Sequence, residues 1–310
     1  MAISALPKKS CGGFTLVELI VVMVLSSILA VMLTDIIISP VTAYVAQSRR
    51  AELVDIADGA LDRISRDLRD ALPNSIRTKT CPDGPCLEFL HTIGGGRYRA
   101  DPPGDYLDLK PSAGDTTFDW LGPLTASVGA NLEDIHLDSL TTNCKDATAT
   151  CLVIYNTGHG SGDAYRGLNV AVVTNVTPSA VPATPHTMEF SFADSGFAAS
   201  PKKFPASPDQ RFYLVNTPVS YLCDTSQKTL RRYQDYSIQS NHNWSDTHAE
   251  LIALTNPAKN ALLATQVESC EFTYTSGTSS RNALVTISLQ MTVDGESVVL
   301  HQQVQVSNTP

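Results

Sequence analysis

CGGFTLVELI, the stretch at residues 11–20, decides the fold of this chain. An apolar run without formal charges follows it at Leu19–Thr34. Together with its apolar flanks the run reaches the ~20 residues that a helix needs to cross a bilayer. A single carboxylate, Glu18, lies almost at the start of the run. The stretch therefore predicts a membrane-spanning helix with an acidic residue near its beginning.

The order of the features differs from that of an ordinary secretory signal. Such a signal places its small residues after the apolar run, which cleavage then discards. In this chain Gly12 and Gly13 come before the run, so cleavage there leaves the apolar helix as the new N-terminus. Lys8 and Lys9 hold the preceding segment on the cytoplasmic side, so we expect the bulk of the chain to lie outside.

Glu18 is physically unusual in this setting. Placing an ionised carboxylate in hydrocarbon costs roughly several kcal/mol of free energy. Such a residue therefore needs a partner or a function. The simpler interpretation is a signal anchor whose carboxylate reaches the membrane interface. The alternative is a functional group that pairs with a positive charge inside the membrane.

The leader residues resemble the class III leader of type IV prepilins and of the pseudopilins of type II secretion. In that family a membrane-bound prepilin peptidase cuts after the glycine and methylates the new amino terminus. The resemblance implies cleavage between Gly13 and Phe14 and N-methylation of Phe14. It also implies an assembly role for Glu18, whose carboxylate would pair with the Phe14 ammonium of a neighbouring subunit.

The resemblance also implies an organisation for the whole chain. Residues 1–13 would be the cleaved leader, and residues 14–72 would form one helix whose membrane segment is about 14–38. Residues 73–310 would form a periplasmic or extracellular head rich in β-strands. The expected fold class is α+β, with a long pilin-type helix, membrane anchor first and amphipathic spine second, packed on a mainly antiparallel β head.

The composition suits a membrane-anchored globular protein that does not bind nucleic acid. The chain has 310 residues, of which 43% are hydrophobic and 17% are charged. The head, roughly 230 residues, is large enough to bury a core. The formal charge is −9, and removing Lys8 and Lys9 with the leader makes it −11 (−9 minus 2). Because an acidic surface repels phosphates, we expect no nucleic-acid partner.

The cysteines indicate an oxidising compartment. Of the seven, Cys11 leaves with the leader, and an even number remains in the head, as disulfide-bonded exported proteins favour. Six cysteines allow about 15 disulfide connectivities, and the sequence alone does not decide among them. Proximity in the sequence favours two of these bonds, Cys81–Cys86 and Cys144–Cys151, and Cys223–Cys270 is then left over. No Cys-x-x-Cys pair suggests a zinc site.

A helical period continues beyond the membrane segment. Apolar residues recur every three or four positions from Leu53 to Leu72, and Pro73 is expected to end the helix. Pro40 can kink it, and Gly59 costs about 1 kcal/mol relative to alanine. Charges between the apolar positions form i,i+4 pairs, which we interpret as a solvated face: Asp62–Arg66, Arg63–Asp67 and Arg66–Asp70.

The head is expected to consist of short strands and turns. Strands are predicted at 86–92, 152–155 and 168–176, with a turn at Gly94–Gly96. A hairpin is predicted from Arg211–Cys223 and Thr229–Tyr236. The last hairpin has a period of two at 285–293, a turn at Asp294-Gly295 and a returning strand at 298–306.

No catalytic constellation or cofactor motif is found, so we expect no enzyme, metal or cofactor. His242 to His248 forms the densest polar cluster, which fits a surface loop better than a metal site. Gly158 to Gly162 departs from the nucleophile elbow of hydrolases and predicts a flexible loop. Asp101, Asp105 and Asp108 could bind calcium but lack the distal glutamate of an EF-hand.

The main functional hypothesis is a non-enzymatic minor pilin. Ala71-Leu72-Pro73-Asn74-Ser75-Ile76-Arg77 resembles the junction after the spine in MshO-type minor pilins of the mannose-sensitive haemagglutinin (MSHA) pilus. The resemblance implies as partners the prepilin peptidase, the inner-membrane assembly machinery, and other major and minor pilins through the N-terminal helix. It implies a single-pass protein of the bacterial inner membrane, with its head in the periplasm, that becomes extracellular in the pilus.

Two alternatives stay open at this stage. One is a J-type pseudopilin of a type II secretion system. The other is a tip adhesin or DNA-capturing subunit, which would require aromatic and basic residues to converge on one exposed surface. The candidates are Arg97, Tyr98 and Arg99 with Arg231, Arg232 and Tyr233.

Overall fold

A computed structural model describes most of the chain. The described residues are 13–109, 114–126, 143–144, 149–177, 186–192, 197, 204–240, 246–254, 258–278 and 281–310. The chain divides into two compact units, Met1–Glu52 and Leu53–Pro310. Lys8, Lys9, Cys11 and Gly12 of the leader lie outside the described residues.

The long N-terminal helix is confirmed as α1, Leu16–Arg69. It continues through Pro40 and ends three residues before the expected Leu72. The earlier end follows from pairing with a strand: the Leu72 N–H donates to the Leu90 carbonyl (2.8 Å) and the Thr92 N–H to the Asp70 carbonyl (2.7 Å). The chain thus begins to pair with β2 before it reaches Pro73, the residue that was expected to end the helix.

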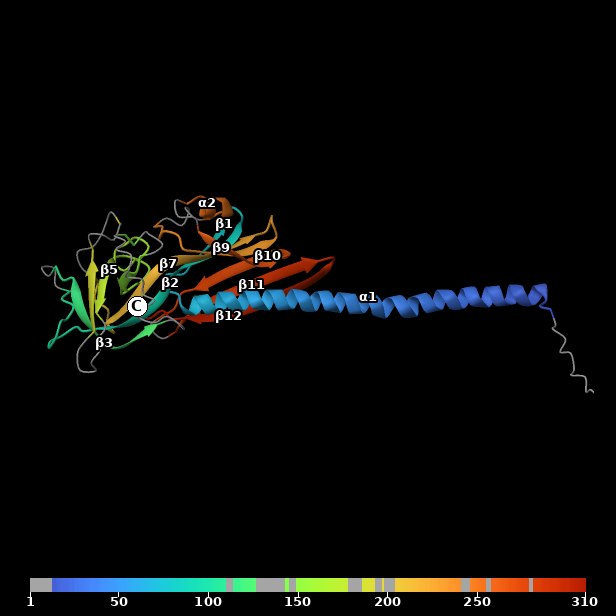
Figure 1. The fold of residues 1–310 in the computed structure, drawn as a ribbon, viewed down its shortest axis with the longest axis horizontal. Coiled ribbons are helices and arrows are strands. Elements are labelled where there is room, and N and C mark those ends of the chain that lie inside the picture. The colour runs from blue at the N-terminus through green and yellow to red at the C-terminus, as the bar shows by residue number, and fades with distance from the viewer. Residues whose placement is uncertain are drawn as a thin grey trace, which may run out of the picture. The chain divides into compact units, whose positions relative to one another are not determined.

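The remaining elements form an antiparallel β head, which confirms the α+β class (Figure 1). They are, in chain order, β1 (Arg77–Cys81), β2 (Gly84–Tyr98), β3 (Thr117–Ala126), β4 (Cys151–Ile154), β5 (Val170–Thr177), β6 (His186–Ser191), β7 (Arg211–Asp224), β8 (Thr229–Gln234), α2 (His248–Ala253), β9 (Lys259–Thr265), β10 (Val267–Thr275), β11 (Ala283–Val293) and β12 (Glu296–Val306).

Six strands of the head close into a ring. Along the sheet the order is β2-β3-β6-β5-β4-β7, and β7 pairs back onto β2, with every pairing antiparallel. Aromatic side chains fill the ring: Phe118 lies 5.4 Å from Phe212 and 5.9 Å from Phe190 between ring centroids. β1, β8 and β9 extend the same sheet beyond the ring.

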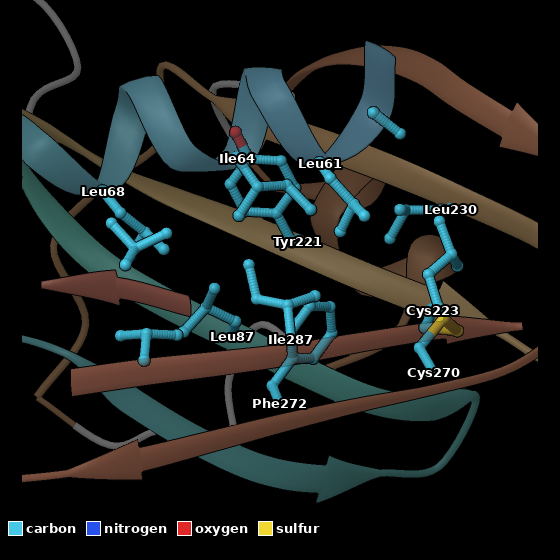
Figure 2. Close-up of a cluster of buried hydrophobic side chains, with 14 of the residues drawn as sticks. Leu61, Ile64, Leu68, Leu87, Tyr221, Cys223, Leu230, Cys270, Phe272 and Ile287 are labelled. Carbon is cyan, nitrogen blue, oxygen red and sulfur yellow. A yellow bond between two sulfur atoms is a disulfide. The ribbon is translucent and has the colours of Figure 1, made fainter. Parts of the chain in front are cut away.

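The last part of α1 shares one core with two sheets. Leu61, Ile64 and Leu68 of the helix are buried with Leu87 and Tyr221 of the large sheet. The same cluster includes Phe272 and Ile287 of the second sheet, whose order is β10-β11-β12 (Figure 2). Leucine and isoleucine at i, i+3 and i+7 form the apolar stripe that a helix buries against a sheet. The amphipathic period predicted this packing correctly.

Both predicted hairpins are confirmed, but the predicted glycine turn is wrong. β7 pairs with β8 and β11 with β12 in the expected register, for example Val293 with Glu296. Gly94–Gly96 instead lie inside β2, where the register shifts against both neighbours. A Cβ at Gly95 would lie 3.0 Å from the Phe212 carbonyl oxygen, so the glycines permit a close approach of β2 to β7.

The disulfide Cys223–Cys270 joins β7 to β10 and hence the two sheets (Figure 2). It closes a loop with a sequence separation of 47, whereas Cys81–Cys86 closes one of 5. The chain-entropy estimate gives about 4 kcal/mol for the long loop and about 2 kcal/mol for the short one.

We therefore expect the double variant Cys223→Ser/Cys270→Ser to lose about 2 kcal/mol more unfolding free energy than Cys81→Ser/Cys86→Ser. Urea unfolding of the two full-length proteins in detergent, followed by tryptophan fluorescence, measures the difference. Equal losses would show that the cross-link between the sheets does not restrain the unfolded chain as its loop length suggests.

Candidate functional site

The start of α1 is fixed by a capping interaction. Thr15 precedes the helix, and its Oγ1 accepts a hydrogen bond from the Glu18 N–H (3.3 Å). Thr15-Leu16-Val17-Glu18 has the spacing of a capping box, which places Glu18 in the first turn, where the helix dipole favours a negative charge. Gly13 and Phe14 lie outside the helix and are exposed, so the bond between them is open to a protease.

The first part of α1 carries apolar side chains that no part of the described chain covers. Phe14 is 82% exposed, Leu16 75% and Val31 68%, and many other large apolar side chains of this part are at least half exposed. In the described residues, α1 is the one helix long and apolar enough to cross a membrane. It fits a single-pass membrane anchor, because water cannot solvate such a surface without a large free-energy cost.

Glu18 is exposed on this apolar helix. Among the described residues no ion pair reaches its carboxylate. A carboxylate next to Leu16, Val17 and Leu19 is costly to leave ionised without a partner once lipid or protein covers the helix.

The six head cysteines form the two bonds that proximity favours and the one that is then left over. The pairs are Cys81–Cys86, Cys144–Cys151 and Cys223–Cys270. The first closes the β1–β2 hairpin, where Cys81 pairs in register with Gly84. All six cysteines are buried, which shields the bonds from reductants in solution.

A buried polar cluster fastens the last turns of α1 to the large sheet. Asp67 accepts hydrogen bonds from the Tyr221 hydroxyl (2.6 Å) and from Arg232 Nε, and its other oxygen lies 3.2 Å from Arg63 Nε. Asp67 and Arg232 are nearly buried. Burial raises the pKa of Tyr221 well above its usual value, and the Asp67 charge adds to the shift. The sequence pattern indicated only a solvated helix face here.

A second polar cluster surrounds Glu88 inside the head. Its Oε2 accepts from the Tyr236 hydroxyl (2.9 Å) and the Ser220 hydroxyl (3.3 Å), and Arg77 Nη1 lies 3.9 Å from Oε1. The Arg77 guanidinium also lies over the Tyr165 ring. Burial raises the pKa of Glu88 above its ordinary value of 4.5, although Arg77 and the hydroxyls oppose this. Glu88 holds together β1, β2, β7 and two loops, and nothing in the sequence singled it out.

The other sequence candidates are dispersed. His248 begins α2, where its Nδ1 lies 2.7 Å from the Tyr233 hydroxyl, and residues 241–245 lie outside the described part. Gly158–Gly162 form a tight loop in which two N–H groups donate to the Gly162 carbonyl. The Asp108 backbone N–H donates to the Asp115 carboxylate (2.7 Å). Within the described residues no group of three His, Cys, Asp or Glu side chains could hold a metal ion.

The residues considered for nucleic-acid capture do not make an exposed aromatic and basic surface. Tyr98 and Tyr233 are buried in the head. Arg232 forms an ion pair with Asp67, and Arg97 Nε donates a hydrogen bond to the Asp209 backbone carbonyl (3.2 Å). These residues serve packing and internal pairing.

Loss of the Asp67 carboxylate should destabilise the head strongly. We expect Asp67→Ala to cost about 3 kcal/mol, because it leaves the Arg232 guanidinium buried without a counter-ion. Tyr221→Phe removes one hydrogen bond and should cost about 1–2 kcal/mol. Urea unfolding of the single and double variants gives the coupling between them, and purely additive losses would contradict a shared network.

The raised pKa of Glu88 has a defined consequence for stability. In the folded protein the proton binds more tightly than in the unfolded chain, so the contribution of Glu88 falls as the pH rises from 4.5 through the raised folded value. Glu88→Gln should remove this part of the pH dependence while keeping most of the packing. Unfolding free energies of the wild-type and Glu88→Gln proteins, measured from acidic to neutral pH, test this. A difference between the two proteins that is constant over that range would contradict it.

Comparison with known proteins places the N-terminal part in a recognisable class. The family model of the prokaryotic N-terminal methylation motif matches residues 8–34. A "Fimbrial protein" of Dichelobacter nodosus is 35% identical over 104 residues, which is 33% of this chain and 59% of that protein. The chain therefore spans less than two thirds of that relative. No solved structure matches the chain. The methylation motif and the fimbrial relative, together with the exposed apolar helix, support the type IV pilin family.

Proposed function

We propose that this protein is a non-enzymatic minor pilin that is incorporated into, or initiates, a type IV pilus of the MSHA type. The observation that carries the proposal is the apolar first part of α1, whose large side chains are exposed, with one carboxylate in its first turn and an exposed Gly13–Phe14 bond before it. This combination suits a helix that is kept after processing and later covered by other helices.

Processing would come first. Prepilin peptidase cuts between Gly13 and Phe14 and methylates the Phe14 amine, which keeps its positive charge. Thr15 then caps the helix directly after the new terminus, so the ammonium lies beside the first turn. The mature protein would wait in the inner membrane as a single-pass protein with its head in the periplasm, the oxidising compartment that its disulfides suit.

Assembly would exchange lipid for protein around α1. The helix satisfies its own backbone hydrogen bonds, so it can leave the bilayer without re-pairing its amides. Contacts with neighbouring helices replace lipid contacts along the apolar surface. The Glu18 carboxylate would pair with the Phe14 ammonium of the adjacent subunit, which sets the position of that subunit along the axis.

The size of the head supports a low-copy position. A head of roughly 230 residues, built from a closed ring and a second sheet, would crowd a repeating lattice of small subunits. A minor pilin, placed at the tip or at initiation, meets less of this crowding. The junction at residues 71–77 and its resemblance to MshO-type pilins support the MSHA system over a J-type pseudopilin, and the neighbouring genes would distinguish the two.

We expect Glu18→Ala and Glu18→Gln to reduce recovery of the subunit in sheared filaments by at least about tenfold, because the ion pair with the next subunit is lost. Both variants should still insert and begin at methylated Phe14, as mass spectrometry of the membrane fraction can establish. Ser27→Ala is the matched control, since Ser27 is a polar residue of the same run whose hydroxyl only returns to the Val24 carbonyl (2.8 Å). Normal recovery of Glu18→Ala would remove the assembly role given to this carboxylate.

A further inference from the structure

The proposed cleavage site lies just before the first turn of α1. Residues 13–15 are outside the helix, which begins at Leu16. In the described part of the chain, the first backbone hydrogen bond of α1 runs from the Leu19 N–H to the Thr15 carbonyl (3.2 Å). The Thr15 Oγ1 accepts a second bond, from the Glu18 N–H (3.3 Å). Thr15 thus makes both hydrogen bonds of an N-cap residue.

The Thr15 hydroxyl competes with a longer helix. An α-helix pairs each N–H with the carbonyl four residues earlier. A helix that continued toward the leader would pair the Glu18 N–H with the Phe14 carbonyl. It would next pair the Val17 N–H with the Gly13 carbonyl, which is the group that cleavage has to attack. By accepting from the Glu18 N–H, the hydroxyl removes the first step of that extension.

The surroundings of the helix start favour such an extension. The apolar side chains of Phe14 and Leu16 are 82% and 75% exposed, so we expect lipid beside them. The first N–H groups of any helix lack a helical partner, and near hydrocarbon an N–H without a partner is unfavourable. More helical turns toward the leader would satisfy these groups, unless a side chain does so first.

We propose that Thr15 is a positioning residue for processing, because its hydroxyl ends the helix before the Gly13 carbonyl is drawn into it. The inference rests on the proposed function, which supplies the peptidase. In the hydrolysis a water oxygen bonds to the Gly13 carbonyl carbon, the bond from that carbon to the Phe14 nitrogen breaks, and the nitrogen takes a proton. A carbonyl without a helical hydrogen bond can accept one from the peptidase during this attack.

The role of Thr15 is separate from that of Glu18. In a capping box the side chain three residues after the cap reaches back to the N–H of the cap residue, and glutamine does this as well as glutamate. Glu18→Gln should therefore be cleaved at the unchanged rate, although assembly is lost. A change at Thr15 should instead act on cleavage, the earlier step.

The test follows cleavage of the full-length chain by purified prepilin peptidase in proteoliposomes, with the cut after Gly13 verified by mass spectrometry. Thr15→Val keeps the shape of the side chain but removes the acceptor. Its kcat/KM should fall about fivefold, which corresponds to the loss of about 1 kcal/mol for an N-cap. Thr15→Ser restores the acceptor and should be cleaved like the wild type.

Thr42→Val is the matched control for this substitution. Thr42 lies further along the same helix, and its hydroxyl donates to the Ser39 carbonyl (2.9 Å). Its cleavage should not change, because the helix start is untouched. Cleavage of Thr15→Val as fast as that of the wild type would overturn the positioning role.

A relocated cap separates helix termination from recognition of the hydroxyl by the peptidase. In Thr15→Val/Leu16→Ser the new serine can end the helix one residue later, which again leaves the Gly13 carbonyl outside it. Cleavage should return to within about twofold of the wild type, since serine caps a helix about as well as threonine. A double variant as slow as Thr15→Val would show that the peptidase reads the hydroxyl itself, and the capping argument would be wrong.

Hydrogen exchange of the Val17 amide reports the helix start without the peptidase. In the wild type this N–H precedes the first helical bond, so it should exchange fast. In Thr15→Val it should exchange more slowly, because the longer helix pairs it with the Gly13 carbonyl. NMR of the full-length chain in detergent micelles measures both. Equal exchange in the two proteins would contradict the extension.

The outcomes also separate this role from the proposed function. If the wild type is cut after Gly13 and Thr15→Val is cut equally fast, the positioning role is wrong and the pilin function stands. If the peptidase does not cut the wild type after Gly13, the proposed function fails and the positioning role fails with it.

Discussion

The apolar surface at the start of α1 has to be covered, and the rest of the structure depends on that requirement. No part of the described chain covers it. A helix can be covered by either lipid or protein, because its backbone amides are already hydrogen-bonded within the helix. Glu18 adds a polar condition, because an ionised carboxylate is costly in apolar surroundings that offer it no partner.

The same helix is built differently where it joins the head. From Leu53 onward its apolar residues narrow to a stripe, and two sheets share the core that covers them. The Asp67 cluster adds a polar attachment that has to break if the helix turns about its axis. Cys223–Cys270 ties the second sheet to the first across this core. The helix end is thus held by apolar packing and by charge, while a covalent bond joins the two sheets that it packs against.

Sequence reasoning was most successful where the deciding contacts are local. The long helix, the hairpins around 224–228 and 294–295 and the disulfides Cys81–Cys86 and Cys144–Cys151 follow from periodicity, turn residues or short separations, and Cys223–Cys270 is the pair that is then left over. It failed where a residue's role depends on a distant one. Gly94–Gly96 indicated a turn, and only the approach of β7 shows why they lie in a strand. Asp67 and Glu88 have ordinary local patterns, and their burial depends on Tyr221, Arg232 and Tyr236, which are far away in the chain.

The closed ring of strands affects how heads behave when many copies lie close together. An open sheet exposes rows of unpaired amides at its two edges, and these can recruit strands from other molecules. By pairing β7 back onto β2, the head turns six of its strands into a surface without such rows. Heads crowded together at a membrane or along a fibre therefore meet no open strand of the ring, and the sheet edges that remain are β1 and β9 of the large sheet and β10 and β12 of the second.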